Sequence, residues 1–386
     1  MRKFQALSLS AALLASLLLG GCANNAASSD AASSDSAASE PEATPEPTPA
    51  PPAANPLTGA ADADYTGKRP VAVTLRNMTG STPQWGIASA DVLVEGVTEG
   101  TTASLMALYA NPDSIAKAGP VGPARDLLLQ VALPLNAVPV HIDKNIYASN
   151  LLNTLAYQDL DGYHIGKTAF AFDQDRQNAG YAEENCWYTT AELINSGLAS
   201  YGVSLNGDNT PLFQFGERPA VDPADRSGMN LTITFSPDDI DCLNYDTGTG
   251  LYALSNGDGS PVQDADNGQQ AGFTNVFVFY ASSGIKDDGY TRQYDMTAGT
   301  GLYLHGGAWE RINWTKEDAT GPFAITNEAG ETLVVSQGKS FIAIWGGYYG
   351  QSISLTAADG SAQTLPDKPA LLESGISDEA AAAAEM

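Results

Sequence analysis

Arg125-Asp126 is the pair of residues in this sequence best placed to bind a small ligand. It follows a Gly/Pro-rich segment and opens a predicted helix. Backbone N–H groups at a helix N-terminus favour anions, and an arginine adds paired hydrogen-bond donors. The alternative is structural, with Arg125 buried against Asp91 or Glu95 and holding the fold together.

His141 ends a predicted strand, and Asp143 follows it closely. Ligands of α/β proteins gather at the carboxyl ends of strands, and a histidine beside a carboxylate can act as a general base. The alternative is that His141 only satisfies a hydrogen bond in the core. Our candidate ligand-binding residues are therefore Arg125, Asp126, His141, Asp143, Asn77 and Glu95.

Other residues that could do chemistry lack the necessary spacing. The three histidines show no metal-binding spacing. Acidic loops at 256–260 and 264–268 suggest Ca²⁺, but neither has the twelfth-position glutamate of an EF-hand, and turn chemistry explains them equally well. Cys186 and Cys242 could pair outside the cell, and neither has a local base that would activate it. We expect no metal and no cofactor.

Residues 1–21 have the organisation of a lipoprotein signal peptide. A basic start precedes an uncharged run over 6–19, which is shorter than the roughly 20 residues that a membrane span needs. Leu19-Gly20-Gly21-Cys22 then resembles the bacterial lipobox, in which the cysteine is acylated and the preceding peptide is removed. We expect Cys22 to carry acyl chains such as palmitate, which would anchor the protein at the extracytoplasmic face of the cell membrane. The alternative is an ordinary secretory signal.

The charge of the chain restricts its partners. Its 386 residues include 45 Asp and Glu against 18 Lys and Arg, a net charge of −27. Nucleic acid is excluded as a partner because phosphate binding needs clustered basic residues. Anionic lipid headgroups and anionic wall polymers are disfavoured for the same reason. Contact with the membrane is therefore expected through the lipid anchor.

The elements that must position these residues fall into two parts. Residues 22–55 contain no Leu, Ile, Val or aromatic residue, which predicts a disordered tether. Strand and helix patterns alternate over 56–208, which predicts a mixed α/β domain. Short period-2 segments separated by turns follow over 209–366, which predicts a mainly antiparallel β domain. The fold class is α+β, and 367–386 is expected to be a tail.

Several of these segments resemble one known family. They are Asn55-Pro-Leu-Thr-Gly59, Arg69-Pro-Val-Ala-Val73, Gly119-Pro-Val-Gly-Pro-Ala-Arg125 and, further on, Gly306-Gly-Ala-Trp309. Together they resemble the DUF3048 group of bacterial lipoproteins, which implies a mixed α/β part followed by a β part, with no established activity. The chain departs from the family pattern at Gly122-Pro123, where Arg-Ser is usual. A shared anion pocket would therefore be reduced here.

Our hypothesis is an extracytoplasmic lipoprotein that binds or scaffolds a component of the cell envelope, either a protein or a glycan. Aromatic residues of the β part, from Tyr290 to Tyr349, could supply the contact surface or could fill the core. The alternative is an envelope hydrolase or transferase that uses Arg125, His141 and Asp143. An enzyme should place those three side chains together in a solvent-reached pocket.

Overall fold

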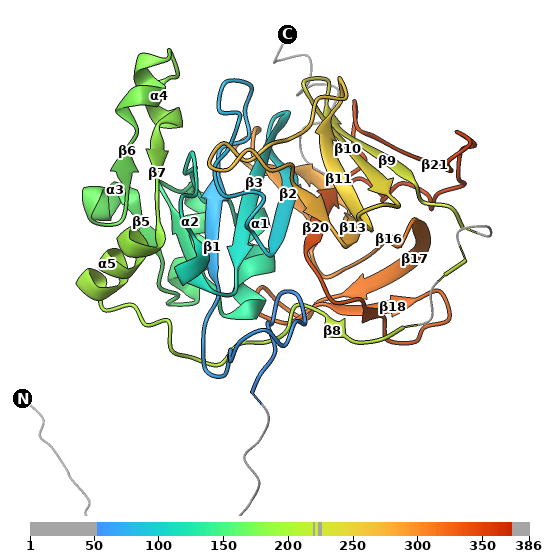
Figure 1. The fold of residues 1–386 in the computed structure, drawn as a ribbon, viewed down its shortest axis with the longest axis horizontal. Helices are drawn as coiled ribbons and strands as arrows, with labels where there is room; N and C mark the ends of the chain where they lie inside the picture. Colours follow the sequence, from blue (N-terminus) through green and yellow to red (C-terminus); the bar gives the residue numbers. More distant parts are fainter. Residues whose placement is uncertain (1–51, 219–220, 223–225, 373–386) are drawn as a thin grey trace, which may run out of the picture. The chain divides into compact units, whose positions relative to one another are not determined.

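The structure is a computed structural model that describes residues 52–218, 221–222 and 226–372, all of them within one compact unit (Figure 1). The predicted signal peptide, Cys22 and most of the predicted tether lie outside the described residues. Asn55, placed at the end of the tether, already belongs to the fold. It is 4% exposed, and its side-chain oxygen accepts hydrogen bonds from the backbone of Leu57 and Thr58.

A mixed sheet of ten strands runs through the molecule, in the order β18-β17-β16-β13-β20-β2-β3-β1-β4-β5. Five of its strands come from the first half of the chain: β1 (Val71–Leu75), β2 (Val92–Glu99), β3 (Thr102–Tyr109), β4 (Val138–His141) and β5 (Leu160–Asp161). The other five come from the second half: β13 (Asn275–Tyr280), β16 (Ala298–His305), β17 (Ala308–Thr315), β18 (Ala324–Asn327) and β20 (Ser340–Trp345). The halves join where β2 pairs in parallel with β20.

A second, antiparallel sheet has the order β12-β11-β10-β9-β21. Its strands are β9 (Asn230–Ser236), β10 (Asp239–Asp246), β11 (Leu251–Asn256), β12 (Gly272–Phe273) and β21 (Ser352–Thr356). Three two-stranded pairs complete the strands of the described residues: β6 (Ala171–Phe172) with β7 (Trp187–Tyr188), β8 (Gln214–Phe215) with β19 (Val334–Val335), and β14 (Ser283–Ile285) with β15 (Arg292–Tyr294).

The helices are short. They are α1 (Asp126–Ala132), α2 (Ile146–Thr154), α3 (Gly162–Ile165), α4 (Gln174–Asn178) and α5 (Ala191–Tyr201), with 3₁₀ turns at Pro112–Ser114, Leu133–Leu135, Gly166–Thr168 and Glu183–Asn185. Within the part of the chain that the structure describes, no helix has the length and apolar character needed to cross a membrane.

Helix α5 is longer than its sequence suggests. Gly197 could end a helix in the sequence, but α5 continues to Tyr201, and Gly202 then adopts the left-handed conformation (φ 65°) typical of a C-terminal glycine. Gly197 instead lies inside the helix, where an added Cβ would come within 2.7 Å of Ala169 Cβ. The glycine therefore permits close packing rather than a stop.

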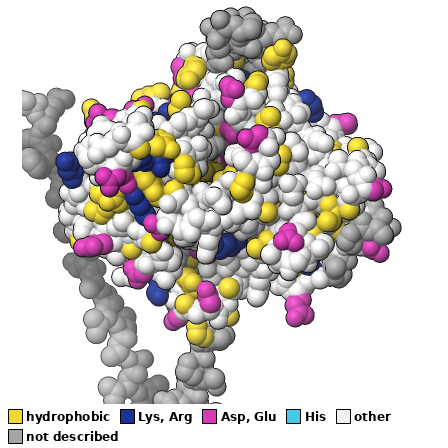
Figure 2. Space-filling view, turned by 45° about the horizontal axis from the view of Figure 1, so that its top comes forward, with side chains coloured by type: hydrophobic (Ala, Val, Ile, Leu, Met, Phe, Trp, Pro, Cys, Tyr) yellow, Lys and Arg dark blue, Asp and Glu magenta, His cyan; other side chains and the backbone are white. Residues whose placement is uncertain are grey.

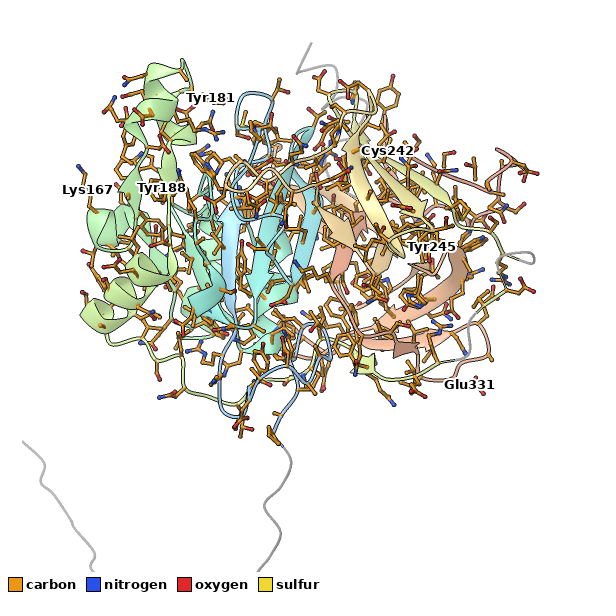
Figure 3. The ribbon with its side chains drawn as sticks, in the orientation of Figure 1. Lys167, Tyr181, Tyr188, Cys242, Tyr245 and Glu331 are labelled. Carbon is orange, nitrogen blue, oxygen red and sulfur yellow. The ribbon has the colours of Figure 1, made fainter. Side chains whose placement is uncertain are left out.

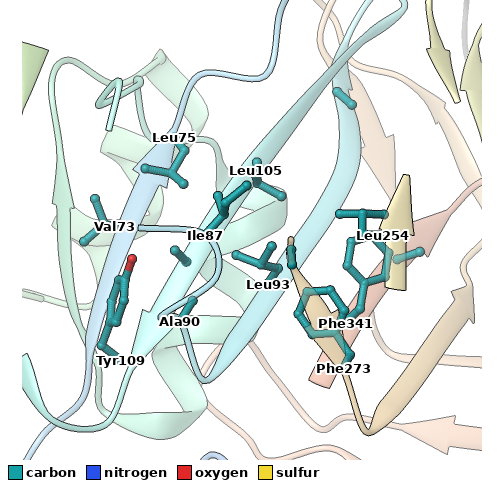
Figure 4. Packing of buried hydrophobic residues seen from close by; sticks show 14 of the residues in the cluster. Val73, Leu75, Ile87, Ala90, Leu93, Leu105, Tyr109, Leu254, Phe273 and Phe341 are labelled. Atoms are coloured by element: carbon teal, nitrogen blue, oxygen red, sulfur yellow. The ribbon is translucent and has the colours of Figure 1, made fainter. Parts of the chain in front are cut away.

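The ten-stranded sheet has an apolar core on each face. Leu93 and Phe341 pack toward the five-stranded sheet, as Figure 4 shows around Leu93, Leu254 and Phe341. The alternate positions, such as Val94, pack toward helix α1 on the other face. Because both faces of these strands are buried, their sequences are nearly continuous apolar runs.

The predicted α+β class is confirmed, since a mixed sheet forms in the first half and antiparallel pairing dominates the second. The predicted division at 208/209 does not separate two sheets, because the ten-stranded sheet takes strands from both sides of it. Part of the predicted tail contacts the fold: Leu372 N donates to Ser283 O at 2.7 Å, and Leu371 pairs with the same residue of β14. The rest of the tail lies outside the described residues.

Candidate functional site

A cleft of about 720 Å³ opens between the ten-stranded sheet and the five-stranded sheet. Its walls come from the loop after β1, the β2–β3 hairpin, the start of β10 and the β11 turn. Five of its lining residues are acidic: Glu95, Asp238, Asp239, Asp241 and Asp258. Among the described residues that line it, none is Lys, Arg or His. Figure 2 shows Asp and Glu side chains spread over the outer surface too, among fewer Lys and Arg.

The period of two along β2 and β10 places three carboxyl groups at the floor of this cleft. On β2, Glu95 faces the same side as Leu93, which packs toward the five-stranded sheet. On β10, Asp239 and Asp241 face the same side as Leu243, which packs in the opposite direction, toward the ten-stranded sheet. The three acids therefore meet where the apolar layer between the two sheets ends.

The three acids are close together and poorly solvated. One carboxylate oxygen from each lies within 4.8 Å of the others, and Glu95 and Asp241 are only 2% and 7% exposed. Asn77 Nδ2 donates to Glu95 Oε1 at 2.6 Å, and Gln84 Nε2 donates to Asn77 Oδ1 at 2.8 Å. No donor among the described residues reaches Oδ2 of Asp239 or Oδ2 of Asp241.

Burial and mutual repulsion make these carboxyl groups weak acids. Burial, followed by the charge of Asp241, raises the pKa of Asp239 to about 7. Burial raises the pKa of Asp241 to about 6. Burial, with both aspartates nearby, raises the pKa of Glu95 well above its ordinary value. Such a cluster can keep a proton near neutral pH or exchange it for a cation.

Two of the predicted ligand-binding residues, Asn77 and Glu95, thus lie in the cleft, whereas the others do not. His141 is fully buried, with its Nε2 2.9 Å from Asp159 Oδ2 and its Nδ1 2.8 Å from the backbone oxygen of Asp143. Lys144 Nζ also contacts Asp159, at 2.6 Å. This arrangement matches the structural alternative for His141.

Arg125, Asp126 and Asp143 also have separate surroundings. Arg125 forms an ion pair with Glu99, with Nε 2.7 Å from Oε1, rather than with Asp91 or Glu95. Asp126 pairs with Lys286, which joins α1 to the loop after β14. The Asp143 side chain is exposed and accepts a hydrogen bond from Lys144 N. The structure therefore does not bring Arg125, His141 and Asp143 together in the cleft.

The acidic loops that suggested Ca²⁺ are explained by turn chemistry. Asp258 Oδ1 accepts hydrogen bonds from Ser260, within its own turn. Asp264 is 1% exposed, and its two oxygens accept from the backbone N–H groups of Gly86, Ala88 and Asp266. Asp264 thereby ties the loop between β1 and β2 to the loop between β11 and β12.

The two thiols do not form a disulfide. Cys186 is buried and its Sγ lies 3.3 Å from Ala182 O, while Cys242 lies on β10, where Figure 3 labels it, 3.8 Å from Thr232 Oγ1. The predicted aromatic surface is largely core. Four of its seven members are at most 7% exposed, and only two are more than half exposed; the four are Trp309, Trp314, Trp345 and Tyr348, and the two are Tyr290 and Tyr349.

The sequence analysis missed Asp239 and Asp241. Their signal was present, because Asp239, Asp241 and Leu243 alternate along a strand and Leu243 identifies that face as the buried one. A buried acid on a strand costs free energy of folding, so its presence points to a role for its carboxyl group. Their position opposite Glu95 depends on the packing of two sheets, which spacing along the chain does not reveal.

The fold and the acidic cleft together define a class of two-sheet protein with a ligand-sized opening between its sheets. Residues 57–204 match the family described as "Protein of unknown function (DUF3048) N-terminal domain", and residues 231–342 match the corresponding C-terminal domain. The chain belongs to the DUF3048 family, as the sequence resemblance suggested.

A relative and a solved structure support this assignment. The chain is 26% identical over 274 residues to "Putative lipoprotein YerB" of Bacillus subtilis (strain 168), a match that covers 67% of this chain and 78% of that protein. The crystal structure of YerB from Bacillus subtilis shares the fold, with a TM-score of 0.68 and 24% identity, over 78% of this chain and 99% of that one.

Proposed function

We propose that this protein is a lipoprotein of the extracytoplasmic face of the cell membrane, and that its cleft binds a component of the cell envelope. The anchor part of the proposal rests on Leu19-Gly20-Gly21-Cys22 and on the relative named as a lipoprotein. Acylation of Cys22 would supply the stable attachment that a strongly acidic surface cannot.

Cys22→Ser tests the anchor. The variant is expected to lose incorporation of labelled palmitate in bacterial cells and to move from the membrane fraction to the soluble fraction, because it lacks the acylated thiol. Cys242→Ser is the matched control, since it also removes a thiol and should change neither result. Unchanged labelling of Cys22→Ser would contradict the anchor.

The binding part of the proposal rests on one observation, the cleft between the two sheets. Its volume of about 720 Å³ falls within the range of small-ligand sites. Its lining mixes apolar side chains such as Ile87 and Leu105 with hydroxyl and amide groups such as Thr102 and Gln263. That mixture suits a ligand with both apolar faces and many hydroxyl or amide groups, as in an N-acetylated glycan.

The charge of the cleft narrows the ligand class further. Five lining acids without a basic side chain among the described lining residues repel an anionic ligand. We therefore propose a neutral or cationic ligand, with an envelope glycan as the favoured class and a basic protein segment as the alternative. Anionic wall polymers and nucleic acid do not fit this lining.

The second candidate, an envelope hydrolase or transferase, was expected to use Arg125, His141 and Asp143. Two of these residues, Arg125 and His141, have polar partners away from the cleft, and Asp143 is exposed elsewhere. No observation favours catalysis by this set, so we propose binding rather than catalysis.

Titration calorimetry of residues 23–386 tests the proposed ligand class. Neutral N-acetylglucosamine oligomers are compared with muropeptide fragments that carry free carboxylates, each without and with EDTA. Saturable binding is expected for the neutral oligomers and weaker binding for the fragments, because the lining acids repel carboxylates. Saturable binding of neither, or tighter binding of the carboxylate-bearing fragments, would contradict the proposal.

A further inference from the structure

We propose that Glu95, Asp239 and Asp241 bind a hard divalent cation, of the Ca²⁺ or Mn²⁺ kind, at the floor of the cleft. The inference deepens the proposed function, because the cation would lie inside the proposed ligand site. It can be tested without any glycan, so its failure and that of the glycan proposal are distinguishable.

The spacing of the three acids suits a single ion. Their ligand oxygens lie within 4.8 Å of one another. Two oxygens that bind one Ca²⁺ at about 2.4 Å each can lie no more than about 4.8 Å apart. Carboxylate oxygens are the ligands that Ca²⁺, Mg²⁺ and Mn²⁺ prefer, whereas softer metals favour thiolate or imidazole. Cys242 lies on the same strand, but its side chain alternates to the opposite face.

Asp241 gives independent evidence that a ligand is missing from its surroundings. It is 7% exposed, it lines the cleft, and no donor among the described residues reaches its Oδ2. Buried polar groups in folded proteins are almost always satisfied. Glu95 and Asp239 lie beside it, and both are acceptors when ionised. Once the cluster has lost its protons, only a cation can compensate Asp241.

A second cluster in the same protein shows how a comparable site is neutralised internally. His141, Asp159 and Asp161 also bring three potential metal ligands together. There, Lys144 Nζ lies 2.6 Å from Asp159 and 3.1 Å from Asp161, so an ammonium group occupies the position of a cation. The cleft floor brings three carboxyl groups together, but its described lining residues include no ammonium, guanidinium or imidazole group.

The cleft leaves part of the coordination sphere open. Ca²⁺ takes 6–8 oxygen ligands, of which three acids supply only some. The volume of about 720 Å³ above the acids has room for water and for ligand hydroxyl groups. A bound cation could thus contact a glycan hydroxyl directly and would convert a repulsive floor into an attractive one.

Titration calorimetry of EDTA-treated, dialysed residues 23–386 with CaCl₂, MgCl₂ and MnCl₂ tests the site. We expect one equivalent of Ca²⁺ or Mn²⁺ to bind and to raise the melting temperature. Asp241→Asn and Glu95→Gln should each weaken binding by about tenfold or more, since each removes a ligand charge. Asp238→Asn is the matched control: it removes an exposed acid from the same cleft and should bind the ion nearly as tightly as the wild type.

The variants also separate a metal site from a merely structural cluster. Without metal, Asp241→Asn and Glu95→Gln should melt no lower than the wild type, because each relieves repulsion among buried acids. Metal should then fail to raise their melting temperatures. The proposal is overturned if none of the three ions binds the wild type, if Asp241→Asn and Glu95→Gln bind as the wild type does, or if Asp238→Asn loses as much affinity as they do.

Discussion

Asp159 and Asp241 are both largely withdrawn from solvent, but only Asp159 faces a cation. Burial alone would raise the pKa of Asp159, yet hydrogen bonds from His141 and Lys144 lower it to about 2. Burial instead raises the pKa of Asp241 to about 6. A lowered pKa thus marks a carboxylate that stabilises the fold. A raised pKa marks one that destabilises the fold unless it binds a proton or a cation.

Asp159 therefore predicts a specific acid dependence of stability. Its folded pKa of about 2 lies below the unfolded value of about 3.9, so its contribution is fully present above pH 4 and is lost as the pH falls through 2. Asp159→Asn should lower the free energy of unfolding by about 2 kcal/mol at pH 7 and should flatten its decline between pH 4 and 2. Urea unfolding at several pH values measures both effects.

Asp175→Asn is the control for this prediction, because Asp175 is an exposed acid on α4 and forms no ion pair among those found in the described residues. Below pH 4, its free energy of unfolding should decline with falling pH as steeply as that of the wild type. If the free energy of unfolding of Asp159→Asn declined below pH 4 as steeply as that of the wild type, then His141 and Lys144 would not stabilise the Asp159 carboxylate.

At the scale of elements, strand β16 depends on glycine where it crosses β13. A Cβ on Gly301 would overlap the backbone oxygen of Val278, and one on Gly299 would overlap that of Tyr280 and the ring of Trp314. At these two positions the strands approach too closely for a side chain, which is the physical reason for glycine there.

Gly301→Ala should therefore lower the free energy of unfolding by about 1–3 kcal/mol, because the strands must separate to admit the methyl group. Thr300→Ala, at the position between the two glycines, should cost less, since it removes atoms rather than adding them. Thermal unfolding followed by circular dichroism compares the two variants. Equal losses would contradict the close-approach argument.

The sequence predicts best the strands whose two faces have the same surroundings. The buried strands β1, β3 and β20 are apolar on both faces, a pattern that the sequence shows directly. Strand β10 does not show it, because its inner face begins with two acids rather than apolar residues. The sequence alone cannot fix the end of α5, because Gly197 can mark either a helix end or a close contact, and only the position of Ala169 decides between them.

At the scale of the whole molecule, the candidate site exists only in the assembled chain. Glu95 comes from the first half and Asp239 and Asp241 from the second, and the sheets that carry them pack face to face. Asn77 and Glu95 could be selected from the sequence, but their partners across the cleft could not. The pairing of β2 with β20 brings the chain's two family domains into one sheet, which fixes one wall of the cleft.

We propose that this cleft is where the protein binds its ligand. Thr101→Trp would place an indole in the cleft and obstruct it, because Thr101 belongs to its lining. Thr364→Trp places the same indole on an exposed position outside that lining. Titration of both variants with neutral N-acetylglucosamine oligomers is the most direct test. Loss of saturable binding in Thr101→Trp alone is the expected result, and wild-type binding by Thr101→Trp would contradict the claim.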